Sequence, residues 1–446
     1  MGKRLTATMA IGSVAVLAAA AFGSAVVAAD PSPSVSPITG DITVLTNRTD
    51  RVDDKTFDGY AAKFKELYPG INVKFEGIKD YDGEVTTRMS TSDYGDVLAR
   101  PITVLPAQLS TFFTPLGSVA DLGKQYRFVS GTASNGDTVY GLAPFGTAQG
   151  IVYNKKVWKD AGITTLPTTP EEFVADLQKI KDANATNKDF IAPLYTNYHD
   201  GWPTTQWYGN VGSITNDPNY NSELAHTDAP WAAGTDLGVI DTLLYDVVKA
   251  GLTEADPLTT DWNPSKVKLA AGQIGAMVLG SWAIAQVEAE AIKLGNTADS
   301  IGYMPFPHQV DGTYYSTSGP DREYLINIHS PNQDAARAWL DWFTNDSGFA
   351  VAEGGIPTPL GGAFPSQLAD FQTLGVKYVE QLPPPVTEAG LTGKIDKESE
   401  IDLAGPTYPQ RIIDAARGQT SETLDAIFTD LNTKWAAARA TVGTGN

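Results

Sequence analysis

The sequence contains no cysteine and only four histidines among its 446 residues. Without cysteine the protein has no disulfide, no thiolate metal site, no cysteine nucleophile and no lipid anchor attached through a cysteine. The histidines are scattered and show no metal-ligand spacing; they are His199, His226, His308 and His329. We therefore expect no metal site, no cofactor, and a fold that is stabilised by the size of its core alone.

Basic residues are also scarce, since 32 Lys and Arg stand against 52 Asp and Glu and give a net charge of −20. Loss of an N-terminal signal carrying Lys3 and Arg4 would make the net charge −22. A surface of this sign repels nucleic acid and anionic lipid. We expect no nucleic-acid partner, and the simplest role of the charge is to keep an exported protein soluble.

Long apolar runs are absent apart from residues 9–29, which are uncharged and follow the basic pair. Basic residues, an apolar run and small residues before Asp30 are typical of an export signal, so we predict a signal peptide at residues 1–29. A retained membrane anchor is the alternative, because the run is close to the length that spans a bilayer. The Pro- and Ser-rich residues 30–40 are expected to form a flexible linker. The mature protein is then extracellular or part of the cell envelope.

The length of the chain exceeds what a single core needs, and its hydrophobic content of 42% allows a sizeable interior. Two domains or two lobes are therefore expected. Residues 41–75 read as strand, helix and strand, with apolar residues on one face of the helix at 55–68. Such a βαβ unit predicts an α/β fold with mostly parallel sheets flanked by helices. Glycine and proline at 140–144, followed by a strand at 150–154, fit a crossing between lobes.

Three later helices have clear sequence signals. The sequence TPEE at 169–172 supplies a cap, a first-position proline and a capping-box glutamate for a helix that ends near residue 183. The apolar spacing of residues 335–343 predicts a helix that packs its two tryptophans in a core. Residues 409–441 are expected to be helical and amphipathic.

Aromatic residues make up 10% of the sequence, and several lie in loop-like segments beside Asp, Gln or Gly. Sugar recognition needs this combination, because the C–H faces of a pyranose stack on flat rings while its hydroxyls bond polar side chains. The rings in question are Trp202, Trp207, Tyr208, Trp262 and Trp282. For the rings other than Trp202 and Trp282, a place in the core is the alternative, because tryptophan is mostly buried whatever its role.

Asp321 and Arg322 follow a Ser-Gly-Pro loop and precede a strand. A charge pair at this place either orients a ligand or forms a surface ion pair of little energy. Catalytic motifs are absent from the sequence, which has no G-x-S-x-G, no P-loop and no G-x-G-x-x-G after a strand. We expect no catalytic residue and no enzyme. A secreted glycoside hydrolase is the alternative, because the 52 acidic residues offer many carboxylate pairs.

Seven short segments have a characteristic order and spacing. They are YGLAP at 140–144, GIVYNKKVW at 150–158, AGI at 161–163, PTTPEEF at 167–173, AGQIGAMVLGSW at 271–282, SPNQDAARAWLDWF at 330–343 and GGIPTP at 354–359. This ordered set resembles extracellular solute-binding protein family 1, the maltose-binding-protein-like substrate-binding proteins of carbohydrate ABC importers. Each segment alone is a weak signal, but together they span most of the mature chain.

The resemblance implies a two-lobed periplasmic-binding-protein-like fold joined by a hinge. One lobe is expected at 41–145 and 312–346, and the other at 146–311 and 347–446. The resemblance also implies a carbohydrate ligand, expected to be an oligosaccharide, that binds in the cleft between the lobes. Delivery to an ABC transporter permease, by a monomer, would follow. A binder of another solute, such as a phosphate ester or a polyamine, is a further alternative.

Site residues follow from the resemblance as well. Trp282 matches the tryptophan that family members often place against the sugar, and Asn47, Arg48 and Asp96 are expected in the cleft by their position alone. The predicted ligand-binding residues are therefore Trp282, Trp202, Trp207, Trp262, Tyr208, Asp96, Asn47, Arg48, Asp321 and Arg322. The chain departs from the family in lacking a lipid-anchor cysteine and in the sequence GPDR at 319–322.

Overall fold

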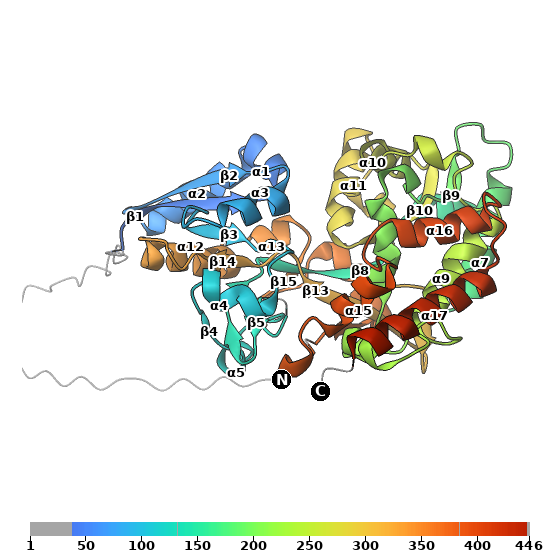
Figure 1. Cartoon of the computed structure of the whole chain (residues 1–446). Helices are drawn as coiled ribbons and strands as arrows, with labels where there is room; N and C mark the ends of the chain where they lie inside the picture. Colours follow the sequence, from blue (N-terminus) through green and yellow to red (C-terminus); the bar gives the residue numbers. More distant parts are fainter. Residues whose placement is uncertain (1–37, 132, 383, 444–446) are drawn as a thin grey trace, which may run out of the picture.

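The computed structural model describes residues 38–131, 133–382 and 384–443, and these form two α/β lobes (Figure 1). The expected signal peptide at 1–29 and all but the last residues of the expected linker at 30–40 lie outside the described residues. None of the described helices combines the length and the apolar character that crossing a bilayer requires.

The first lobe contains a mixed five-stranded sheet. In spatial order its strands are β2 (Ile71–Gly77), β1 (Gly40–Thr46), β3 (Val97–Ala99), β14 (Tyr324–Ile326) and β7 (Gly141–Leu142). Strands β1 and β2 are parallel, with Ile42 opposite Val73, and α2 (Thr56–Leu67) connects them. The predicted βαβ unit is therefore confirmed, and α2 buries Phe57, Tyr60 and Phe64 as its spacing predicts.

The other elements of the first lobe cover this sheet. They are α1 (Thr49–Asp53), α3 (Tyr81–Arg88), α4 (Leu109–Phe112), α5 (Val119–Leu122), α12 (Gln333–Asn345), α13 (Phe349–Ala352) and a small sheet of β4 (Gly117–Ser118), β6 (Thr138–Val139) and β5 (Ser134–Asn135). Trp339 and Trp342 of α12 are buried against Phe64, which confirms the core position predicted for both tryptophans.

The second lobe is built on a larger mixed sheet. Its strands are β12 (Gln309–Val310), β13 (Thr313–Pro320), β8 (Phe145–Asn154), β10 (Ile274–Gly280) and β9 (Ala192–Leu194), with β11 (Ile301–Met304), β15 (Ile356–Pro357) and β16 (Lys377–Glu380) paired alongside. Side chains alternate along β8, so that Ile151 and Tyr153 enter one hydrophobic cluster and Val152 enters another. Helices cover both faces of the sheet, so the second lobe has two hydrophobic clusters, one on each face.

Two groups of helices flank this sheet. The first group is α6 (Lys155–Asp160), α7 (Pro170–Ala183), α8 (Tyr220–Glu223), α9 (Asp236–Lys249), α15 (Leu391–Ser399), α16 (Thr407–Ala416) and α17 (Leu424–Val442). The second group is α10 (Trp262–Ala270), α11 (Trp282–Lys293) and α14 (Ala369–Leu374). Helix α7 starts as predicted, because Pro170 is its first residue and the Thr169 hydroxyl accepts the Glu172 N–H at 3.2 Å.

The C-terminal stretch differs from the expectation for 409–441. It forms two helices, α16 and α17, because Gly418 adopts a left-handed φ of 75° that only glycine tolerates easily and that ends α16. Both helices bury apolar side chains, so the amphipathic character is as expected.

The chain crosses between the lobes three times, at residues 142–145, 320–324 and 352–356, and we call these crossings the hinge. Figure 1 shows β8, β13 and β15 between the two lobes. Strand β13 pairs with β8 and β16, so it belongs to the second lobe and the expected boundary at 312 lies too early. Helix α13 packs Phe349 against Phe57 of the first lobe, so the expected boundary at 347 is too early as well.

Candidate functional site

Three tryptophans that are distant in sequence meet on the second lobe. The ring centroid of Trp202 lies 5.5 Å from Trp262 and 5.7 Å from Trp282, and Trp262 lies 5.5 Å from Trp282. Each is the first residue of a helix: the 3₁₀-helix η3 (Trp202–Asn210), α10 and α11. We call these three rings the indole platform.

Polar contacts fix the backbone segments that carry the rings of the indole platform. The Ser281 hydroxyl accepts the Ala148 N–H of β8 at 3.0 Å, and the Ser281 N–H donates to the Ala148 carbonyl at 2.8 Å, which sets the start of α11. The Trp262 N–H donates to the Asp200 carboxylate at 2.5 Å. These bonds hold the rings in place before any ligand arrives.

The platform is partly open to solvent, unlike a core cluster. Trp202 is 38% exposed, and Trp262 and Trp282 are half-buried. The ammonium of Lys266 lies 5.1 Å from the ring centroid of Trp262, a cation–π contact at the edge of the platform. The rings meet at interplanar angles of 79°, 46° and 69°, so they form a partly exposed apolar cluster of differently oriented rings. Exposed rings beside polar groups suit a ligand with both C–H faces and hydroxyls.

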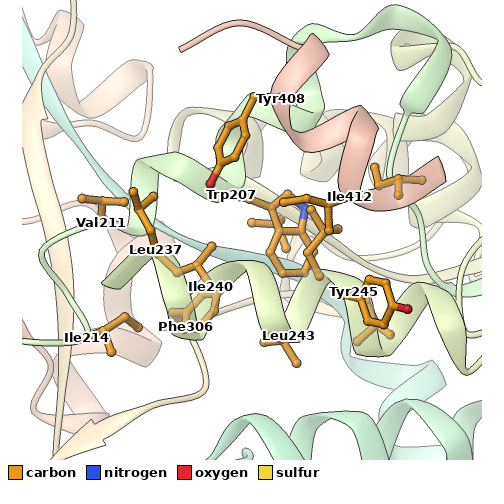
Figure 2. Close-up of a cluster of buried hydrophobic side chains, with 14 of the residues drawn as sticks. Trp207, Val211, Ile214, Leu237, Ile240, Leu243, Tyr245, Phe306, Tyr408 and Ile412 are labelled. Carbon is orange, nitrogen blue, oxygen red and sulfur yellow. The ribbon is translucent and has the colours of Figure 1, made fainter. Parts of the chain in front are cut away.

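Trp207 does not join the platform, although the sequence placed it among the ligand-binding residues. It is 3% exposed and its ring lies 6.4 Å from that of Phe306 in the core of the second lobe. Figure 2 shows Trp207 among side chains of α9 and α16, such as Leu243 and Ile412. The role of Trp207 is therefore structural, because η3 turns this ring inward.

Tyr208 lies at a small cavity beside the hinge, which we call the hinge pocket. The cavity has a volume of about 250 Å³. Its lining residues are Gly131, Gln149, Tyr208, Gly209, Val211, Asn221, Thr317, Ser318, Gly319, Pro320 and Gln381. Gly131 belongs to the first lobe and most of the others to the second, so the pocket has walls from both lobes.

On the first lobe, Asn47 and Arg48 form the turn that follows β1, and both are half-buried. The Arg48 guanidinium donates to the carboxylates of Asp50 and Glu353, each at 2.9 Å. Glu353 stands at the third crossing of the chain, so this pair ties the turn to the hinge. Nothing in the sequence marked Glu353, whose contact with Arg48 depends on the fold.

Asp321 and Arg322 do not form the pair that the sequence suggested. Arg322 donates to both carboxylate oxygens of Asp82, at 2.7 and 2.8 Å, and lies over the ring of Tyr81 at 5.5 Å. These contacts of Arg322 therefore lie within the first lobe and stabilise it. Asp321 stays at the crossing, where burial raises its pKa to about 6 against the opposing attraction of Arg48.

Asp96 lies away from the platform. It precedes β3, and the register of β3 with β1 places it beside Thr43, in the middle of β1, whereas Asn47 and Arg48 follow the end of β1. The Asp96 carboxylate accepts the Thr43 N–H at 2.8 Å and the Ser330 hydroxyl at 2.5 Å. It joins β1 to the segment that leads into α12.

Asp50 of α1, in the first lobe, attracts the charge of Lys266 of α10, in the second lobe. Burial lowers the pKa of Lys266, and the carboxylates of Glu290 and, in the other lobe, of Asp50 oppose that shift. Figure 1 places α1 and α11 on the sides of the two lobes that face each other. Asn47 and Arg48 lie directly before α1, and their place in a ligand cleft stays a prediction.

A larger cavity, of about 610 Å³, lies between α7 and α9. All its lining residues, which include Glu171, Val239 and His308, belong to the second lobe, so movement of the hinge would not complete it. Within the described residues no group of three His, Asp or Glu side chains is arranged to hold a metal ion.

The fold and the platform together define a class of protein: two α/β lobes joined by a three-part hinge, as in two-lobed solute-binding proteins. Residues 48–348 match the bacterial extracellular solute-binding proteins, and the chain belongs to this family. The family and the two-lobed fold predicted from the sequence are thereby confirmed.

Individual relatives are similar over most of their length. A manno-oligosaccharide specific solute-binding protein, BlMnBP2 of Bifidobacterium animalis subsp. lactis, was solved with mannotriose; it shares 33% identity with a TM-score of 0.81, over 91% of this chain and 95% of that one. BlMnBP1 of the same organism, solved with mannobiose, shares 35% identity with a TM-score of 0.81 over the same fractions. The diacetylchitobiose binding protein DasA of Streptomyces coelicolor is 28% identical over 322 residues, which are 66% of this chain and 68% of that protein.

Proposed function

We propose that this protein binds a neutral oligosaccharide between its lobes and delivers it to the permease of an ABC importer. The observation that carries the proposal is the indole platform: three partly exposed tryptophans in mutual contact beside the hinge. Pyranose C–H faces stack on such rings, and the surrounding amides, hydroxyls and carboxylates bond the sugar hydroxyls.

We further propose that the ligand is a manno-oligosaccharide. Its support is the likeness to BlMnBP1 and BlMnBP2, whose complexes contain mannobiose and mannotriose and which resemble this chain over 91% of its length. The name of DasA points instead to a chitin-derived disaccharide, at lower identity and coverage. Titration with both kinds of oligosaccharide separates the two ligand classes.

Binding is coupled to hinge closure in this account. The platform stands on the second lobe, and the turn with Asn47 and Arg48 stands on the first. A ligand that touches both surfaces binds the closed form more tightly and shifts the population toward it by that difference in affinity. The importer permease then receives the closed, loaded protein.

The remaining parts of the proposal concern export and chemistry. Export by the signal at 1–29 and action as a monomer fit the family, whose members are extracellular. No covalent step is assigned, so the protein should bind its sugar and release it intact. A glycoside hydrolase would instead liberate new reducing ends.

Isothermal titration calorimetry with mannobiose, mannotriose and diacetylchitobiose tests the proposal, with a reducing-end assay on the same mixtures. We expect saturable binding of the manno-oligosaccharides, weaker binding of diacetylchitobiose and no increase in reducing ends. If only diacetylchitobiose binds tightly, the ligand is a chitin-derived sugar and not a manno-oligosaccharide. Release of reducing ends would overturn the binding-only function.

A further inference from the structure

The hinge pocket has the chemistry of a site for an uncharged, hydroxyl-rich group. Its described lining consists of amides, hydroxyls, glycines and a few apolar side chains, and it includes no charged side chain. Its volume of about 250 Å³ is below the roughly 300 Å³ at which pockets for drug-sized ligands begin. A single sugar ring is therefore the size of group that it suits.

Two amide oxygens at this pocket are buried without a partner. The Oε1 atoms of Gln149 and Gln381 have no hydrogen-bond partner among the described residues, whereas the Nε2 of Gln381 donates to the Val211 carbonyl at 3.4 Å. Buried acceptors in folded proteins are nearly always paired. Both oxygens have almost no solvent-accessible surface in this structure, so a ligand hydroxyl would pair with them once the two amide side chains turn toward the cavity.

Gln149 also connects the hinge pocket to the indole platform. It pairs with Gly280 across β8 and β10, two residues before Trp282. A Cβ atom placed on Gly280 would lie 2.5 Å from the Trp282 Nε1 and 3.5 Å from the Gln149 Nε2. The Gln149 side chain thus lines the hinge pocket and lies close to Trp282 of the indole platform.

Gly319 keeps the pocket open on the hinge side. It lies on β13, next to Pro320, and a Cβ atom placed on it would have no neighbour within 4 Å. Its φ does not lie in the left-handed region, so a larger residue fits the backbone without strain. A side chain at this position would project into the cavity rather than into the protein.

We propose that the hinge pocket is a sugar subsite that takes one neutral pyranose ring at the end of the oligosaccharide. The hydroxyls of the ring donate hydrogen bonds to Gln149 and Gln381. Gly319 has no side chain and therefore leaves the space that the ring occupies. Because Gly131 of the first lobe lines the same pocket, the bound ring contacts both lobes and favours closure. This inference rests on the proposed function, since it names a further part of the same binding site.

The test measures the affinity for mannotriose of two variants and a control. Gly319→Leu should weaken binding at least tenfold because leucine occupies the place of the ring, and Gln381→Leu should weaken it at least threefold because one acceptor is lost. Gly59→Leu is the matched control, because Gly59 is exposed on α2 and its added Cβ would also meet nothing within 4 Å. It should bind as the unmodified protein does.

The outcomes separate the subsite from the function. If the unmodified protein binds mannotriose and Trp282→Ala weakens that binding, but both pocket variants bind normally, the subsite is wrong and the function stands. If the unmodified protein binds none of the oligosaccharides, the proposed function is wrong and the subsite proposal falls with it. Thermal unfolding without ligand shows whether Gly319→Leu folds; if it does not, Gln381→Leu alone decides.

Discussion

At the scale of single residues, neighbours decide what a tryptophan does. Trp202 and Trp207 are five positions apart in η3, yet Trp202 is 38% exposed and Trp207 is 3% exposed. The sequence marks both as aromatic residues in a loop beside polar ones. It does not contain the contacts with Trp262 or Phe306, which come from distant segments and give the two rings opposite roles.

Replacing Trp282 with alanine should weaken sugar binding by about 1–3 kcal/mol, because a stacking surface is lost. The thermal midpoint of the unliganded protein should barely change, since the ring is only half-buried. Calorimetry with mannotriose and a thermal melt measure the two effects. An unchanged affinity would remove Trp282 from the site.

Replacing Trp207 with alanine should have the opposite pattern. The loss of a large buried ring destabilises a core by about 3–5 kcal/mol. Urea unfolding should therefore show a much lower midpoint, while any folded fraction keeps its affinity for sugar. A stable variant with weakened binding would mean that Trp207 does contact the ligand.

Asp96 gives a third residue-scale prediction, because its carboxylate accepts two hydrogen bonds within the first lobe. Asp96→Ala should lower stability by about 1–3 kcal/mol, since the Thr43 N–H and the Ser330 hydroxyl lose a charged acceptor. Affinity for mannotriose should stay the same. A selective loss of affinity would restore Asp96 to the binding site.

At the scale of elements, local signals were sufficient where one helix or one strand carried its own pattern. The cap at Thr169 and the apolar spacing of α2 and α12 predicted these helices from a few adjacent residues. The division of the C-terminal stretch at Gly418 was missed, because an apolar pattern continues on both sides of the break. The pairing of β13 with β8 was also missed, since pairing is a long-range property.

A buried carboxyl group joins two helices of the second lobe. Asp241 of α9 accepts hydrogen bonds from the Trp231 indole, at 3.0 Å, and from the Tyr408 hydroxyl at the start of α16. Burial raises the Asp241 pKa to about 7 from its usual 3.8, although both bonds oppose the shift. The folded protein therefore holds a proton that the unfolded chain releases above about pH 4.

This linkage predicts how stability depends on pH. Because the folded state binds the extra proton, the contribution of Asp241 to stability falls as pH rises from about 4 to about 7. Asp241→Asn lacks this proton and should lose that part of the pH dependence. Urea unfolding of both proteins at pH 5 and pH 7.5 measures it; parallel changes in the two would contradict the assignment.

At the scale of the whole molecule, the sequence predicted two lobes and the family but not the surfaces that meet between them. The hinge pocket collects Gly131, Gln149, Gly319 and Gln381 from four separate parts of the chain. No local pattern links these residues, and strand periodicity alone does not say which of them faces a cavity. Only the three crossings of the chain bring them together.

The central claim is that the lobes close on an oligosaccharide held by the indole platform. Because the chain has no cysteine, Asp53→Cys on α1 and Lys293→Cys on α11 accept a donor and an acceptor dye at those two sites only. Energy transfer between the dyes, measured during a mannotriose titration, reports the distance between the lobes.

We expect the energy transfer to rise to saturation with mannotriose. We also expect Trp282→Ala to move the midpoint to a concentration about 5-fold to 150-fold higher, the equivalent of about 1–3 kcal/mol. Transfer that does not change at any concentration of mannotriose, or a midpoint that Trp282→Ala leaves in place, would contradict the central claim.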